Sequence, residues 1–233
     1  MAADVKSDEP AGLTVDLSLL ELRPGQRLLD VGCGSGRHLF ACHHLGARAI
    51  GIDIAAANWE RTDGTPAFLA ADGGALPFSD ASFERVICTE VLEHTTDPDG
   101  CVGEMARVLV RGGRAAVSVP TSFTEDIFWR FPGYAPTPGG HIRIFRTGEL
   151  CRLLTGHGFR IYAMRYRHSL QSVLWLLRCL SGFRGATEPL GAVGGAGGRR
   201  LRSSVYLSQP VQTLERLGDF VWPKSLVLYA AKA

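Results

Sequence analysis

Short runs of apolar residues alternate with longer amphipathic stretches along most of this 233-residue chain. Such short runs are typical of strands buried on both faces of a parallel sheet, and the stretches between them are typical of the helices that cover it. The pattern therefore predicts a series of βαβ units. Strands are expected at residues 27–31, 48–53, 67–70, 84–88, 113–119, 159–166 and 225–231.

The helix with the clearest boundaries precedes residue 113. Asp97 is a candidate N-cap, Pro98 suits the first helical position, and apolar residues recur at helical spacing as far as Leu109. The Gly112–Gly113 pair is expected to end this helix. Further helices are expected at residues 15–22, 37–45, 147–157, 169–180 and 209–220, with a poorly ordered glycine-rich linker at 182–198.

Three alternating glycines follow the first predicted strand. Gly32, Gly34 and Gly36 let the backbone turn sharply and approach a ligand without a Cβ in the way. Asp53 closes the second apolar run, where a carboxylate is placed to accept hydrogen bonds from both hydroxyls of a ribose. The two features together predict a nucleoside bound at the ends of the strands.

Two further residues narrow the kind of nucleoside. A dinucleotide fingerprint, G-x-G-x-x-G, requires glycine at position 37, where this chain has Arg37. Asp30 adds a negative charge just before the glycines, which is unfavourable beside a pyrophosphate and favourable beside a cationic amine or sulfonium. A nicotinamide oxidoreductase is thereby disfavoured.

The segment Leu28–Gly36 resembles motif I of the class I S-adenosylmethionine-dependent methyltransferases, whose usual form is (L/V)LD(V/I)GCG(T/S)G. Two later stretches are similar to further motifs of this family and occur in the same order. Residues 70–83 resemble D-A-x-x-L-P-F-x-D-x-S-F, and residues 88–94 end in V-L-E-H. By these motifs the chain is identified as a member of the ubiquinone/menaquinone-type (methyltransferase type 11) branch, over about residues 15–165.

The resemblance implies an α/β fold, specifically a Rossmann-like three-layer sandwich. Its seven-stranded sheet is expected to be mostly parallel, with an antiparallel last strand. A single methyltransferase domain is expected over residues 1–233. Within it, residues 120–146 are expected to form a substrate-side loop, and residues 169–222 an insertion before the last strand.

The resemblance also implies which residues bind the cofactor, S-adenosyl-L-methionine. Asp30 is expected to orient the methionine amine, and Gly32 and Gly34 to lie against the methionine and ribose. Asp53 is expected to accept the ribose hydroxyls, and Ile54 beside it to cover one face of the adenine.

The second and third motifs carry the remaining cofactor roles. Asp72 is expected to accept a hydrogen bond from the adenine amine, and Gly73, where the family more often has alanine, to offer its backbone N–H to the ring. Thr89 and Glu90 are expected to border the methionine end. For Asp72 the alternative is a turn-forming aspartate before two glycines.

His141 is the candidate general base, because it ends the expected substrate-side loop and an imidazole accepts a proton near neutral pH. A structural role is the alternative, since similar E-H-x-R-x-(F/Y) stretches precede the following helix in many relatives. For Glu93 and His94 the structural role is favoured. Aromatic side chains between residues 123 and 134 either wall the acceptor site or form a small core that holds the loop.

The expected reaction is transfer of a methyl group from S-adenosylmethionine to an oxygen, carbon or nitrogen of a small-molecule or lipid-linked acceptor. Holding the acceptor against an already activated methyl group supplies much of such catalysis, so little base assistance is needed. The alternative is a non-catalytic S-adenosylmethionine-binding or scaffold protein that has kept the cofactor motifs.

Composition indicates the compartment in which the protein is expected and excludes a membrane span. The chain is 45% hydrophobic and 21% charged, and it has no run of 18 apolar residues. Its N-terminus is polar and resembles no targeting signal, and its six cysteines are scattered without metal-ligand spacing. A cytoplasmic protein with reduced cysteines and no metal site is expected.

Charge is distributed unevenly along the chain. Residues 141–202 contain 11 basic and two acidic residues, whereas residues 1–140 contain 11 basic and 19 acidic ones. This split indicates either an anionic partner or a solvated arginine-rich surface. The apolar helix expected at residues 170–180 is accordingly either a peripheral membrane contact or a core or dimer helix. No nucleic-acid-binding module is recognisable, and the sequence does not reveal the oligomeric state.

Overall fold

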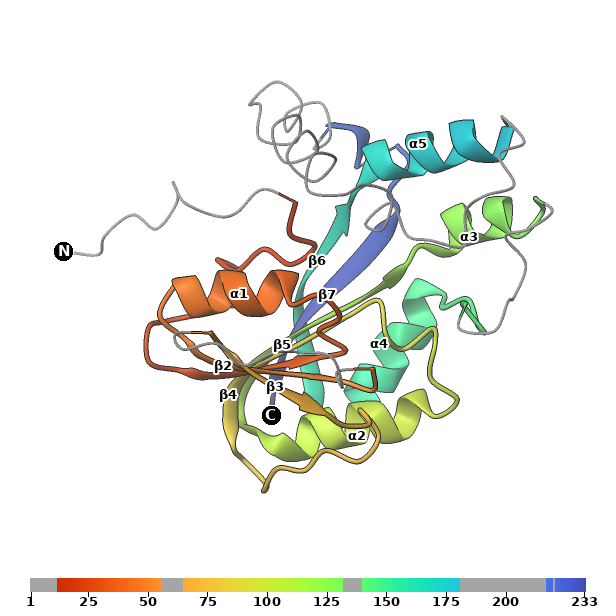
Figure 1. Cartoon of the computed structure of the whole chain (residues 1–233). Helices are drawn as coiled ribbons and strands as arrows, with labels where there is room; N and C mark the ends of the chain where they lie inside the picture. The colour runs from red at the N-terminus through yellow and green to blue at the C-terminus, as the bar shows by residue number, and fades with distance from the viewer. Residues whose placement is uncertain (1–11, 56–64, 132–139, 181–216, 220) are drawn as a thin grey trace.

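The computed structural model describes residues 12–55, 65–131, 140–180, 217–219 and 221–233 (Figure 1). The expected linker at 182–198 and nearly all of the expected helix at 209–220 lie outside these residues. The following description concerns the described part of the chain.

Seven strands form one mixed sheet in the order β3-β2-β1-β4-β5-β7-β6. Strands β1 to β5 run parallel to one another, whereas β7 pairs antiparallel with both β5 and β6. This arrangement confirms the expected fold class, including the antiparallel last strand. The strands are β1 (Arg27–Val31), β2 (Arg48–Asp53), β3 (Ala67–Ala70), β4 (Phe83–Thr89), β5 (Leu109–Pro120), β6 (Phe159–Arg167) and β7 (Ser225–Lys232).

Helices lie on both faces of the sheet and form the outer layers. Figure 1 shows α1 on one face, α2 and α4 on the other, and α3 and α5 together beyond one end of the strands. The expected cap of α2 is confirmed, because the Asp97 side chain accepts a hydrogen bond from the Gly100 N–H at 2.9 Å. The helices are α1 (Arg37–His44), α2 (Pro98–Val108), α3 (Ser122–Phe128), α4 (Thr147–Gly156) and α5 (Ser169–Leu180).

One expected helix and the expected end of another are wrong. Residues 17–21 form turns rather than part of a helix, because the Asp16 carboxylate accepts hydrogen bonds from the Ser18 N–H and hydroxyl and Glu21 has a left-handed backbone. Strand β5 begins at Leu109, so the Gly112–Gly113 pair lies inside a strand instead of ending α2. The register of β4 against β5 shifts at this point, and Gly112 has φ +71°, which marks an irregular stretch of strand.

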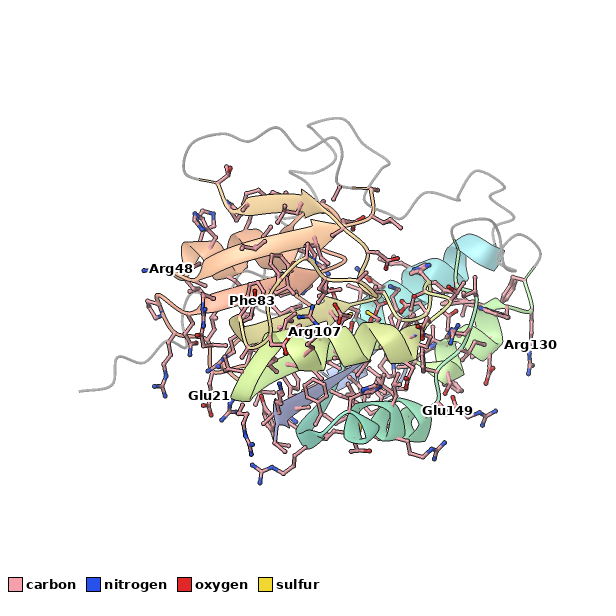
Figure 2. All side chains as sticks on the ribbon, turned by 90° about the horizontal axis from the view of Figure 1, so that it is seen from below. Glu21, Arg48, Phe83, Arg107, Arg130 and Glu149 are labelled. Carbon is pink, nitrogen blue, oxygen red and sulfur yellow. The ribbon has the colours of Figure 1, made fainter. Side chains whose placement is uncertain are left out.

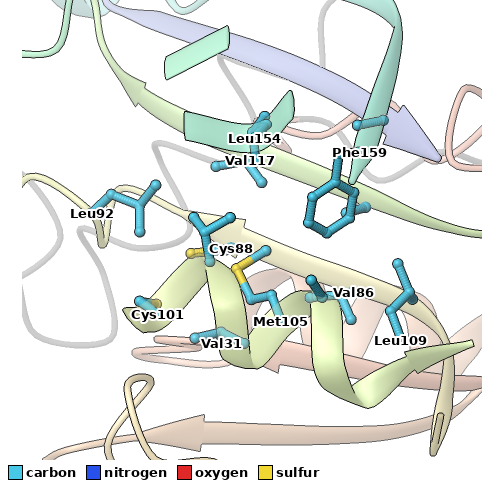
Figure 3. Close-up of a cluster of buried hydrophobic side chains, with 14 of the residues drawn as sticks. Val31, Val86, Cys88, Leu92, Cys101, Met105, Leu109, Val117, Leu154 and Phe159 are labelled. Atoms are coloured by element: carbon cyan, nitrogen blue, oxygen red, sulfur yellow. The ribbon is translucent and has the colours of Figure 1, made fainter. Parts of the chain in front are cut away.

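The hydrophobic core has one part on each face of the sheet. Neighbouring strand residues face opposite sides, so Leu29 packs beneath α2 and α4 whereas Leu28 packs beneath α1. Figure 3 shows the cluster between α2 and the sheet. Cys88 and Cys101 belong to it, and Cys42 belongs to the other cluster, which confirms that these cysteines serve as small core hydrophobes.

Candidate active site

The predicted cofactor residues meet where the direction of the fold reverses. From β1 the chain builds outward to β2 and β3, and then returns to place β4 on the other side of β1. A crevice opens at such a reversal, outside the carboxyl ends of the strands. Asp30, Asp53 and Thr89 lie at or next to the carboxyl ends of β1, β2 and β4, so the structure brings together residues far apart in the sequence.

The glycine turn after β1 requires glycine for two separate reasons. Gly32, Gly34 and Gly36 have φ values of +67°, +50° and +77°, which side chains with a Cβ rarely adopt. At Gly32 a Cβ would in addition overlap with Cγ2 of Val91, which follows β4. The turn therefore brings its backbone close to the segment after β4.

Asp30 has a buried carboxylate that is able to accept a cationic ligand. Its side chain is 1% exposed, and neither carboxylate oxygen has a hydrogen-bond partner among the described residues. Burial raises the pKa of Asp30 to about 7, and the nearby Leu39 backbone N–H and, less strongly, the Arg37 guanidinium only partly oppose this shift. A cationic amine placed beside Asp30 would satisfy these oxygens and favour the ionised form, so this residue fits S-adenosylmethionine.

Asp53 links the end of β2 to the glycine turn. Its Oδ2 accepts a hydrogen bond from the Gly34 N–H at 2.9 Å, and its Oδ1 accepts one from the Ala55 N–H at the same distance. These bonds fix the carboxylate beside the glycine turn and leave it lone pairs able to accept further hydrogen bonds. Ile54 beside it is 80% exposed.

Asp72 does form the turn that was its alternative role. Its Oδ1 accepts a hydrogen bond from the Gly74 N–H at 2.9 Å. At Gly73 a Cβ would lie 3.1 Å from Cys101 Sγ and 3.2 Å from Val31 Cγ1, so the alanine usual in the family would require both neighbours to yield slightly. This crowding explains why glycine is found here.

The stretch after Asp72 is held by α2. Arg107 lies on α2 (Figure 2). It donates hydrogen bonds to the Phe78 carbonyl at 2.7 Å and the Leu76 carbonyl at 3.0 Å, and Glu104 accepts one from the Leu76 N–H. Arg107 also pairs with Asp80 at 2.8 Å. These bonds to α2 hold the loop of the second motif at residues 76–80, the stretch that follows Asp72.

Glu90 has a strained backbone, and its carboxylate interacts with Ser118 and Lys224. Its φ of +56° is unusual for a residue with a side chain. The Ser118 hydroxyl donates to its Oε1 at 3.1 Å, and Lys224 Nζ lies 3.5 Å from its Oε2. The carboxylate thus joins β4 to β5 and to the segment before β7, and Thr89 precedes it at the end of β4.

Arg37 was read from the sequence only as a departure from a dinucleotide motif, and its contacts were missed. Its guanidinium donates to the Gly12 carbonyl at 2.8 Å and to the Thr14 hydroxyl at 2.9 Å. His38 accepts a hydrogen bond from the Thr14 N–H, and burial lowers its pKa to about 3, so it is neutral. These two residues fasten the N-terminal segment next to the glycine turn.

His141 lies against two residues that the sequence did not connect to it as partners. Its Nδ1 is 2.7 Å from Oε2 of Glu125, which is 2% exposed and comes from α3. Its ring packs edge to face against His94, with 4.8 Å between ring centroids. Helix α3 lies within the expected loop at 120–146 and was not predicted, so no sequence signal pointed to Glu125.

Glu93 is a second buried carboxylate near His141. It is 1% exposed, its oxygens have no hydrogen-bond partner in the described ranges, and burial followed by the charge of Glu90 raises its pKa well above the ordinary value. Ligand-type atoms of Glu93, His94 and His141 lie within 4.8 Å of one another. The sequence predicted no metal site, yet these residue types are able to hold a divalent cation.

The aromatic residues of the 120–146 region differ in burial. Phe128 is 1% exposed and belongs to the interior, as expected for a small core. Phe123 is 57% exposed and packs edge to face against Trp222, and the Trp129 indole N–H donates to Glu125 Oε2 at 2.9 Å. Tyr134 lies outside the described residues.

Part of the chain is similar in sequence to known methyltransferases. Residues 29–117 match the family model described as "Methyltransferase domain". The chain is 37% identical over 109 residues to 27-O-demethylrifamycin SV methyltransferase of Amycolatopsis mediterranei, a match covering 42% of this chain and 40% of that protein. Matches to the first curated relatives span 39% to 47% of those proteins, less than half their length.

Solved structures show the fold over nearly the whole chain. An S-adenosylmethionine-dependent methyltransferase from Mesorhizobium loti is 18% identical with a TM-score of 0.56, covering 93% of this chain and 95% of that one. The [4+2]-cyclase SpnF is 21% identical with a TM-score of 0.57, covering 92% and 77%. Residues 29–117 therefore match a methyltransferase-domain model, and the described chain has the Rossmann-like fold that these solved structures share.

Proposed function

We propose that this protein binds S-adenosylmethionine at the carboxyl ends of β1, β2 and β4 and transfers its methyl group to a small-molecule or lipid-linked acceptor. The observation that carries the proposal is Asp30, a buried carboxylate without a partner in the described structure, beside a turn of left-handed glycines. An uncompensated buried charge is costly, and a cationic ligand removes that cost.

The cofactor roles follow from the positions of the residues. Asp30 would hold the methionine amine, with Gly32 and Gly34 against the methionine and ribose, Asp53 on the ribose hydroxyls and Ile54 on the adenine face. The remaining roles, at the adenine amine, the ring and the methionine end, fall to Asp72, Gly73, Thr89 and Glu90. For Glu90 the contacts with Ser118 and Lys224 support a fixed wall rather than a freely moving ligand.

His141 is the proposed catalytic residue, acting as general base on an acceptor hydroxyl. When bound, S-adenosylmethionine supplies a methyl group already activated by a sulfonium, so that the new bond to carbon forms as the carbon–sulfur bond breaks. His141 would take the hydroxyl proton at Nε2 during this transfer and release it to solvent afterwards. The residues around it would chiefly position the acceptor and exclude water.

We also propose that residues 1–233 act as one domain, with the acceptor bound between the region 120–146 and the insertion 169–222. The relatives' names support this reading, because 27-O-demethylrifamycin SV methyltransferase is named for a small-molecule substrate. The alternative of a non-catalytic cofactor-binding protein has one supporting observation, since SpnF shares the fold and is named a cyclase.

The function is tested first by cofactor binding. Calorimetry with S-adenosylmethionine is expected to show binding that Asp53→Ala weakens about tenfold or more, because the ribose hydroxyls lose their acceptor. Incubation with methyl-labelled S-adenosylmethionine and cell lysate is then expected to place label in a small-molecule or lipid fraction. No binding at millimolar cofactor would refute the proposal, and binding without any labelled fraction would favour the non-catalytic alternative.

Helix α5 supports a peripheral contact with a membrane. Its Val173, Leu174 and Leu177 are 41%, 38% and 58% exposed, whereas Ser172 is buried against the body of the protein. Among the described residues, no helix is both long enough and apolar enough to cross a membrane. An exposed apolar face next to the exposed Arg165 suits anionic lipid headgroups.

Replacing Leu177 with glutamate is expected to reduce flotation with phosphatidylglycerol vesicles several-fold, because it places a negative charge on the apolar face. Leu69→Glu on β3 is the matched control, since Leu69 is 41% exposed and lies at the other end of the sheet. Equal flotation of the two variants and the wild type would exclude this contact and leave a dimer helix, which sedimentation would detect.

A further inference from the structure

We propose that Glu125 is the positioning residue of this site, holding His141 in the tautomer and orientation that a general base requires. The inference rests on the proposed function, and it adds a residue from α3 that no sequence motif carries. It is argued from the contacts of Glu125, from the way the His141 segment is docked, and from the chemistry of the pair.

Glu125 has the burial and the partners of a fixed acceptor. One oxygen, Oε2, receives both the Trp129 indole N–H at 2.9 Å and His141 Nδ1 at 2.7 Å. A carboxylate at 2% exposure cannot rotate into water, and the indole donor one helical turn away fixes its plane. The carboxylate therefore presents a set acceptor position to the imidazole.

The segment that carries His141 is docked independently of Glu125. Ile142 N–H donates to the Glu93 carbonyl at 2.9 Å, and His94 Nδ1 lies 3.1 Å from the Gly140 carbonyl. Burial lowers the pKa of His94, so that a neutral ring donates its Nδ1–H to this carbonyl. Residues on both sides of His141 are thus held by the turn after β4, and Glu125 determines only how the imidazole ring is oriented.

This geometry sets the proton positions needed for base catalysis. A carboxylate only accepts, so the hydrogen on His141 lies on Nδ1 and the lone pair lies on Nε2. When Nε2 takes a proton from an acceptor hydroxyl, the ring becomes cationic and the carboxylate stabilises that charge. The arrangement of nucleophile, base and orienting acid is a general one for such proton transfers.

The charged and titratable groups that face His141 come from two elements. Helix α3 contributes Glu125, and the turn after β4 contributes Glu93 and His94. Glu125 contacts Nδ1 directly, so removing its charge is expected to affect the imidazole more than removing the side chain of Glu93 or His94.

The test compares Glu125→Gln with the wild type, using Asp126→Asn as the control because Asp126 lies next on the same helix and is exposed. Glutamine can still accept from Trp129 and His141 but carries no charge. In ¹⁵N NMR of the full chain, the His141 ring is expected to hold its proton on Nδ1 in the wild type and in Asp126→Asn, and to lose this tautomer preference in Glu125→Gln, because a glutamine amide can either accept or donate. This readout needs no acceptor.

Activity is measured as methyl label entering the lysate fraction that the wild type labels. Glu125→Gln is expected to lower the turnover rate about 10- to 100-fold, with S-adenosylmethionine affinity within threefold of wild type, and Glu125→Asp to recover part of the rate.

An unchanged His141 tautomer in Glu125→Gln would overturn the inference, whether or not methyl transfer is found. Failure of the wild type to bind S-adenosylmethionine would instead refute the proposed function. A wild-type rate in His141→Gln would refute the base and, with it, the role of Glu125. Stoichiometric Zn²⁺ binding by the wild type that His141→Gln abolishes would also overturn it, because a metal ligand cannot serve as the base.

Discussion

Replacing Asp30 with asparagine is expected to weaken S-adenosylmethionine binding about 30-fold or more while removing a pH-dependent cost from the ligand-free fold. The loss of affinity follows because the variant takes away the buried anion that the methionine amine would meet. Calorimetry at pH 8 measures this effect. The Asp126→Asn variant, which removes an exposed charge, is the control and is expected to bind normally.

The stability effect of this variant has a definite sign. The folded-state pKa of Asp30 is about 7, above the ordinary 3.8, so the folded protein holds this proton more tightly than the unfolded chain. The stabilisation is complete below the unfolded pKa and is lost as the pH rises toward 7. The difference between the folded and unfolded pKa values of Asp30 corresponds to roughly 4 kcal/mol of unfolding free energy at most.

Urea unfolding of the ligand-free proteins at pH 5, 6, 7 and 8 measures that effect. The free energy of unfolding of the wild type is expected to fall relative to Asp30→Asn up to about pH 7 and to stay level above it. A difference that does not change with pH would show that burial does not hold the proton on Asp30. S-adenosylmethionine affinity of the wild type is expected to rise with pH over the same range, because binding the cation releases that proton.

Replacing Gly32 with alanine is expected to destabilise the protein by about 2–4 kcal/mol and to reduce S-adenosylmethionine affinity at least tenfold. A left-handed backbone with a Cβ costs about 1–2 kcal/mol, and the overlap with Val91 Cγ2 adds a cost typical of overpacking. The glycine turn or the segment after β4 must then move, and both border the proposed cofactor site.

Two further variants separate strain from overlap. Gly34→Ala has a left-handed backbone too, but its Cβ would meet nothing within 4 Å, so only the conformational cost is expected. In the double variant Gly32→Ala/Val91→Ala the overlap is removed, and unfolding measurements should show coupling of about 1 kcal/mol or more. Equal destabilisation by Gly32→Ala and Gly34→Ala would contradict the close approach of Val91.

The sheet was predictable because its strands depend on local patterns, and these patterns also placed the candidate cofactor residues at strand ends. The strand at 27–31 is a continuous apolar run, and the glycines and Asp53 sit at its end and at the end of the next strand. The segment 15–22 was mistaken for a helix because its leucines have helical spacing, whereas the Asp16 side chain bonds to nearby backbone and favours a turn. Its apolar residues are nevertheless buried, as expected of a helix face.

Residues that meet only through the fold were not predictable. His141 and Glu125 are joined by a bond between a loop and a short helix whose aromatic sequence resembled a loop. Arg37 was informative as a mismatch, yet its bonds to Gly12 and Thr14 depend on where the N-terminal segment packs. The cluster of Glu93, His94 and His141 likewise exists only because the turn after β4 docks the segment following residue 139.

The position of β7 between β5 and β6 has a consequence for folding kinetics. Strand β6 cannot join the sheet until β7, residues 225–232, has paired with β5. In the chain, residues 168–224 lie between β6 and β7. Closing a longer loop costs little free energy, since each doubling adds about 0.6 kcal/mol, but it delays the pairing. During that delay the open edges of β5 and β6 invite pairing with other chains, so assembly of this half of the sheet is the step at which aggregation should compete most strongly.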